Sequence, residues 1–112
     1  FSGRDEPDAH FRCVELDSGR IKWSRDERWQ KRGSKQPNVY GRGSAVMADN
    51  RLFVLGEGGL LGLFEVTAAK PVELGRHQVP ELHYPCWAAP ILSDKRMVIR
   101  SEDYLICFDV AK

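Results

Sequence analysis

The sequence predicts an all-β fold, built from the antiparallel four-stranded blades of a β-propeller. Three observations lead to this fold class. The apolar residues fall in short, strand-sized runs, one residue pattern recurs along the chain, and no stretch combines a 3.6-residue apolar period with helix caps. A recurrence every 44 to 50 residues, with four short strands in each interval, is typical of propeller blades.

The recurring pattern is a seven-residue strand. Each copy has a small or apolar residue in fourth place, an apolar residue in fifth, an acid in sixth and a branched aliphatic residue in seventh. The copies are His10–Leu16, Leu60–Val66 and Tyr104–Val110, whose starts lie 50 and 44 residues apart. The preceding segments Ser44–Leu55 and Ala89–Arg100 also match, since each is an apolar run, a polar turn beginning at Asp, an Arg and a second apolar run.

These repeats place the strands and divide the chain into three segments. Residues 1–30 are expected to hold the last two strands of one blade, residues 31–80 one complete blade, and residues 81–112 the first three strands of a further blade. The loops are expected at 26–43 and 78–87. The predicted strands are 10–16, 20–25, 44–48, 51–55, 60–66, 71–77, 88–92, 96–100 and 104–110.

Two apolar runs predict how the sheets pack. Leu52–Leu55 and Met97–Ile99 do not alternate between apolar and polar residues, as a strand with one wet face would. We therefore expect strands that are buried on both faces, as the inner strands of neighbouring blades are.

The segment Cys13–Trp23 resembles the repeat of pyrroloquinoline quinone (PQQ) dehydrogenases and their non-catalytic relatives, Ala-x-Asp-x-x-Thr-Gly-x-x-x-Trp. In this resemblance the glycine supplies the positive φ of a tight turn, the acid and the hydroxyl satisfy the backbone of that turn, and the tryptophan docks against the next blade. The residues at the five motif positions are Cys13, Glu15, Ser18, Gly19 and Trp23.

The other two copies carry less of this motif. In the second copy the acid is kept, but counting along the sequence puts Ala69 at the glycine position and Glu73 at the tryptophan position. The third copy reaches Lys112 before the positions of its glycine and tryptophan.

The resemblance implies a binding scaffold. The expected function is that of a non-catalytic PQQ-like propeller segment, without catalytic residues, cofactor or metal of its own. The expected partners are the remaining propeller blades, a second copy of the chain, or another protein. The alternative is a fragment of a PQQ-dependent dehydrogenase whose cofactor site lies in other blades. Because the family is found mainly in the periplasm or outside the cell, the resemblance also implies a periplasmic or extracellular location.

Composition argues against two classes of partner. The 17 Lys and Arg residues balance 16 Asp and Glu residues, so there is no overall field to attract nucleic acid or an anionic membrane. The longest apolar run, Leu60–Phe64, is far shorter than the roughly 20 residues of a membrane-spanning helix. The N-terminal residues have no signal-peptide pattern, which leads us to expect a mature product or an excised fragment. Cys13, Cys86 and Cys107 fit no common zinc or redox motif, and we expect them to be small buried hydrophobes.

Several short motifs have both a functional and a structural interpretation. The glycines of Gly56–Gly62 suggest a phosphate-binding loop, although a strand follows them and the spacing favours a hairpin turn. His77, His83 and Cys86 have zinc-ligand chemistry but no evident fourth ligand, so they are alternatively loop residues. Trp87 either packs between blades or contacts a ligand.

Two charged segments remain. Ser24–Gln36 gathers basic residues around Trp29, which would suit single-stranded nucleic acid, or would simply be a solvated loop. Glu102 and Asp103 are adjacent carboxylates. They are expected to point apart in a turn, whereas acid–base catalysis would need them to converge.

Overall fold

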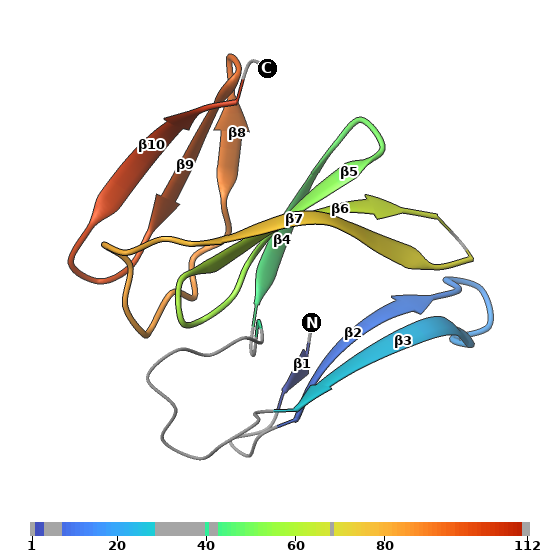
Figure 1. Ribbon diagram of the computed structural model, residues 1–112. Coiled ribbons are helices and arrows are strands. Elements are labelled where there is room, and N and C mark those ends of the chain that lie inside the picture. The colour runs from blue at the N-terminus through green and yellow to red at the C-terminus, as the bar shows by residue number, and fades with distance from the viewer. Residues whose placement is uncertain (1, 4–7, 29–39, 41–42, 68, 111–112) are drawn as a thin grey trace.

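The structure, a computed structural model, describes residues 2–3, 8–28, 40, 43–67 and 69–110. It confirms the all-β prediction, because the described residues form strands and connecting turns and contain no helix. It follows that none of these residues forms a helix long and apolar enough to cross a membrane. In the described part of the chain, ten strands form three antiparallel sheets, each with its strands side by side in sequence order (Figure 1).

The first sheet consists of β1 (Ser2–Gly3), β2 (Asp8–Val14) and β3 (Ile21–Arg28). It has one strand more than predicted, since the short β1 pairs with β2. β3 also runs three residues beyond its predicted end. Its last residues are polar and have low strand propensity, but their backbone pairs with β2 as far as the Asp8↔Arg28 pair.

The second sheet consists of β4 (Ser44–Ala48), β5 (Arg51–Leu55), β6 (Leu60–Val66) and β7 (Pro71–Gln78). The first three strands have the bounds that the sequence predicts, because turn residues mark their ends sharply. Between β4 and β5 the chain reverses at Asp49, whose φ is +53°, and aspartate is among the few non-glycine residues that adopt this conformation readily.

The third sheet consists of β8 (Ile91–Ser93), β9 (Arg96–Arg100) and β10 (Leu105–Asp109). β8 begins at residue 91, three residues later than predicted. β8 and β9 are joined by Asp94 and Lys95, with φ values of +47° and +64°. Two consecutive residues of positive φ match the right-handed twist of a hairpin.

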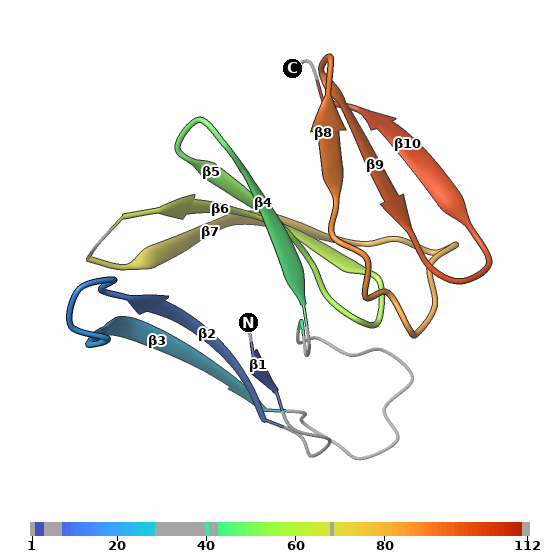
Figure 2. The same cartoon turned by 180° about the vertical axis from the view of Figure 1, so that it is seen from behind.

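The second sheet lies between the other two (Figures 1 and 2). Between the first and second sheets is one core, which we call the first core, and between the second and third sheets is another, the second core. The buried residues of the first core are Phe11, Tyr40, Val54, Leu60 and Phe64. Those of the second core are Leu55, Val79, Leu82, Cys86, Met97 and Ile99.

Successive residues of β5 enter different cores. Val54 belongs to the first core and Leu55 to the second, and both are fully buried. Phe53 is partly buried against the second core, and Leu52 against the first. This explains why the run Leu52–Leu55 does not alternate, and it confirms the prediction that this strand is buried on both faces.

Candidate functional site

The turn between β2 and β3 contains three of the five motif residues, Glu15, Ser18 and Gly19, while Cys13 lies near the end of β2. Gly19 has a φ of +73°, and a Cβ there would have no heavy atom within 4 Å, so backbone conformation rather than space requires glycine. The Ser18 hydroxyl donates to Glu15 Oε2 at 2.6 Å and accepts from the Arg20 amide at 3.2 Å. The Gly19 amide donates to the Glu15 carbonyl at 2.8 Å. The acid and the hydroxyl thus hold the turn together.

The fifth motif residue, Trp23, connects two sheets. Its side chain is partly buried against the first core, and its ring meets Phe11 edge to face at a centroid distance of 5.1 Å. Its indole Nε1 donates to the carbonyl oxygen of Thr67 at 3.0 Å. Thr67 directly follows β6, so Trp23 fastens the first sheet to the turn of the second sheet.

The strand register places Gly75, and not Glu73, at the position of the second sheet that corresponds to Trp23. Both sheets have a register shift at the same repeat position, after Cys13 in β2 and after Leu63 in β6. Trp23 pairs with Cys13, but Gly75 pairs with Leu63. The segment between the paired positions is longer in the second sheet, because the strand pairing continues to Val66↔Pro71, and counting along the sequence could not reveal this. A Cβ at Gly75 would meet no heavy atom within 4 Å.

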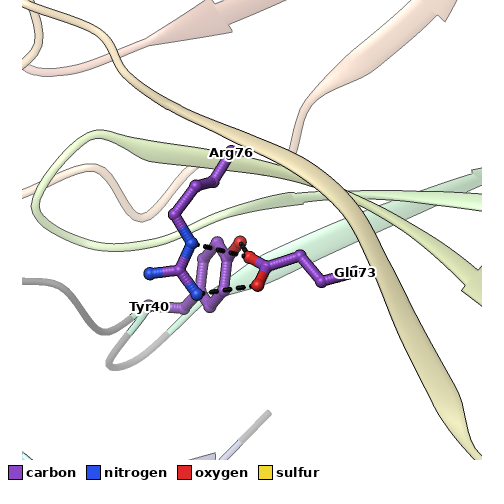
Figure 3. Close-up of polar contacts among 3 residues, drawn as sticks. All are labelled: Tyr40, Glu73 and Arg76. Carbon is purple, nitrogen blue, oxygen red and sulfur yellow. Dashed lines mark hydrogen bonds and ion pairs between the residues drawn. The ribbon is translucent and has the colours of Figure 1, made fainter.

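Glu73 instead belongs to a polar cluster with Tyr40 and Arg76 (Figure 3). The Tyr40 hydroxyl donates to Glu73 Oε1. Arg76 donates from Nε to Oε1 at 2.9 Å and from an Nη atom to Oε2 at 2.8 Å, and its guanidinium lies 5.5 Å from the centre of the Tyr40 ring. Tyr40 is only 1% exposed. The carboxylate therefore satisfies a buried hydroxyl and is itself neutralised by the arginine.

Two glycines make room for Tyr40. A Cβ at Gly62, in the middle of β6, would overlap the Tyr40 ring, and a Cβ at Gly56 would overlap the Tyr40 backbone. Tyr40 lies in the segment 26–43, which was predicted to be a loop, and its burial was not predicted. The available signal was Gly62 itself, because a glycine inside an apolar strand often marks a close approach by another group.

The residues Gly56–Gly59 form the hairpin turn between β5 and β6, with the Gly56 amide bonded to the Leu60 carbonyl at 2.8 Å. Its acid, Glu57, is 6% exposed. The Glu57 carbonyl accepts from the Cys86 amide at 2.8 Å, and its Oε2 accepts from Trp87 Nε1 at 3.3 Å. The turn therefore anchors the loop after β7. Its glycines lie in a hairpin turn, which is the structural interpretation of this motif.

Trp87 combines a fixed orientation with exposure. Although its indole nitrogen is bonded to Glu57, 54% of the residue is exposed, and Tyr84, 58% exposed, meets its ring edge to face at 5.7 Å. Beside Trp87 is a small cavity of about 90 Å³. It is lined by Pro85, Trp87, Ala88, Arg100, Ser101 and Glu102. We call Tyr84, Trp87 and this cavity the aromatic corner.

His77, His83 and Cys86 do not converge. His77 is exposed on β7 and His83 is exposed in the following loop, whereas Cys86 is buried in the second core. The Cys86 thiol donates to the His83 carbonyl at 3.1 Å, and burial raises its pKa. Within the described ranges, no group of three or more His, Cys, Asp or Glu side chains is placed to hold a metal ion.

The other predicted features are distributed as follows. Cys13 is partly buried and Cys107 is exposed, so the expectation of burial is wrong for Cys107. Glu102 and Asp103 are exposed in the β9–β10 turn, where the Ser101 hydroxyl accepts from the amides of Asp103 and Tyr104. Of the basic segment, Ser24–Arg28 lies in β3, and residues 29–36 with Trp29 lie outside the described residues.

Comparison with known proteins gives no assignment: no family model, no curated protein and no solved structure matches the chain.

Proposed function

We propose that the chain is a segment of a PQQ-like β-propeller that acts as a non-catalytic binding scaffold. The observation that carries this proposal is the middle sheet, whose two faces are both covered by sheets built from the same repeat. Each sheet of a propeller meets its neighbours in this way, so stacking and repeat agree.

Two further contacts support this architecture. β4 and β8, the first strands of the second and third sheets, lie against each other, as the innermost strands of adjacent blades do around a propeller axis. Trp23 is bonded to the turn of the following sheet, which is the docking role that the repeat resemblance implies. Four residues of the repeat motif therefore have structural contacts in this architecture, namely Glu15, Ser18, Gly19 and Trp23.

As the binding region we propose the aromatic corner. Burying an exposed indole contributes favourably to binding, and holding it in place beforehand reduces the entropy lost on association. Trp87 meets both conditions through its bond to Glu57. The cavity beside it would accept one apolar side chain, and Arg100 and Glu102 in its lining could pair with polar groups. These properties suit a short peptide segment of a partner protein.

A displayed library of random peptides tests this assignment. The library would be selected on the intact chain and then on the variants Trp87→Ser and Leu16→Ser. Leu16 is 99% exposed in the turn between β2 and β3, outside the aromatic corner, and provides the matched loss of an exposed apolar residue. We expect enriched peptides to lose binding to Trp87→Ser only. Peptides that bind both variants equally would contradict the assignment.

The absence of catalysis is tested separately. We expect no saturable heat in a calorimetric titration of the chain with PQQ and calcium, and no turnover in a dye-linked dehydrogenase assay. Micromolar binding of the quinone would overturn the scaffold proposal, and turnover would establish the enzyme alternative.

A further inference from the structure

Adjacent sheets of this chain always meet in the same polarity. We call the side of a sheet that faces the following sheet along the chain its leading face, and the opposite side its trailing face. Phe11 and Trp23 on the leading face of the first sheet meet Phe64 on the trailing face of the second. Phe53 and Leu55 on the leading face of the second sheet meet the trailing face of the third sheet in the second core. Both interfaces therefore pair a leading face with a trailing face.

The leading face of the third sheet carries an apolar row across its three strands, between the exposed residues Arg96 and Arg100 of β9. Met97 and Ile99 are buried on its trailing side, so Val98 points to the leading side, where Ile91 and Cys107 flank it in register. In the second sheet the corresponding row is Val46, Phe53 and Leu63. On this face Ile91 is 61% exposed and Leu105, which corresponds to Leu61, is 72% exposed.

Cys13 and Cys107 show the difference directly. They occupy the same place in the repeat and both lie on leading faces. Cys13 lies beneath the second sheet and is partly buried, whereas Cys107 is exposed. The third sheet thus presents the residues of an interface on a face that no described residue covers.

A complementary apolar pair lies on the trailing face of the first sheet. Val14 corresponds in the repeat to Phe64, a buried residue of the first core, and it pairs across the sheet with Ile21. Val14 and Ile21 are 49% and 48% exposed. The chain therefore has one exposed leading face at its third sheet and one exposed trailing face at its first.

We propose that these two faces bind each other between two copies of the chain, head to tail. The contact would be heterologous, because different surfaces of the two copies meet, and such contacts form a ring when the rotation closes. Two copies supply six sheets, within the roughly four to eight of closed propellers. This closure rests on the propeller architecture proposed above. The interface itself rests on the observed polarity of stacking.

Variants that place a charge on one face at a time test the proposal. Ile91→Lys with Leu105→Lys alters only the leading face of the third sheet, and Val14→Lys with Ile21→Lys alters only the trailing face of the first. All four residues are exposed in the single chain, so circular dichroism should show an unchanged β spectrum. Met47→Lys is the matched control, because Met47 is 60% exposed and belongs to β4 of the middle sheet, which carries neither face. Sedimentation should give a dimer for the unmodified chain and for Met47→Lys, and a dissociation constant raised about tenfold or more for each double variant.

Mixing the two double variants gives the decisive result. Each retains the face that the other has lost, so an equimolar mixture should form a one-to-one complex through a single interface. A monomeric unmodified chain at all concentrations would overturn the dimer. Association of the Val14 and Ile21 variant with itself would show leading face against leading face, and would overturn the head-to-tail contact. Neither result bears on the stacking of sheets within one chain. That stacking is tested independently by substituting Trp23, which is bonded to Thr67.

Discussion

The indole nitrogen of Trp23 and the carbonyl oxygen of Thr67 lie 3.0 Å apart, although the two residues belong to different sheets. This bond joins the start of β3 to the turn that follows β6. It is a contact between repeats, formed by a residue of the repeat motif.

Replacing Trp23 should loosen the junction of the first two sheets. Trp23→Ala should lower the free energy of unfolding by about 3 kcal/mol, at the lower end for large aromatic residues because the ring is only partly buried. Trp23→Phe keeps the packing against Phe11 but loses the bond to Thr67, so it should cost less. Urea unfolding followed by circular dichroism measures both. Equal effects of the two variants would show that ring packing contributes nothing.

Two glycines on neighbouring strands should respond in opposite directions to alanine. Gly75→Ala should raise the free energy of unfolding by about 0.5–1 kcal/mol, because a strand glycine loses more backbone entropy on folding than alanine and the new Cβ meets open space. Gly62→Ala should lower it by about 1–3 kcal/mol, because the Cβ would overlap the buried Tyr40 ring. Thermal unfolding of the two variants side by side checks the difference in sign.

The hydroxyl of Tyr40 should contribute to stability through Glu73. Tyr40→Phe should cost about 1–2 kcal/mol, since a charge-assisted hydrogen bond is lost in a buried setting. Tyr104→Phe, at a residue that is 53% exposed, is the matched control and should change stability by less than about 0.5 kcal/mol. In a Glu73→Gln background the effect of Tyr40→Phe should shrink. An unchanged effect there would mean that the hydroxyl acts through another group.

The three cysteines should react with alkylating reagent in the order Cys107, Cys13, Cys86, in samples dilute enough to prevent self-association. Exposure sets the first two. Cys86 is buried, and its raised pKa leaves less reactive thiolate at a given pH. In the unfolded chain this thiol has its ordinary, lower pKa and loses its proton more easily. The free energy of unfolding should therefore fall as pH rises past the ordinary pKa of a cysteine thiol. Mass spectrometry of time-quenched samples gives the order, and early modification of Cys86 would contradict the packing of the second core.

Strand bounds were predicted best from the sequence where residues that favour turns mark the ends of the strands. β4, β5, β6 and β9 have their predicted bounds because Asp49, Asp94 and the glycines after Leu55 mark reversals locally. β1 and the polar end of β3 were missed because backbone pairing with β2, and not residue preference, forms them.

The candidate site was harder to predict from sequence, because it too depends on contacts between segments and not on local residue preference. Tyr40, Glu57 and Trp87 acquire their roles from contacts between segments far apart in the chain. The pairing of Gly75 with Leu63 depends on how far the pairing of β6 with β7 extends, to Val66↔Pro71, and nothing in the residue types of β7 indicates this.

The middle sheet, covered on both sides, gives the molecule an uneven distribution of local stability. Proteins made of stacked repeats behave approximately as one-dimensional arrays, in which each unit is stabilised by its nearest neighbours. A unit with two neighbours opens less often than a unit with one. The amides of β5 and β6 should therefore exchange their hydrogens with solvent most slowly, and those of β2, β3, β9 and β10 sooner, so that the chain unravels from its outer sheets inward.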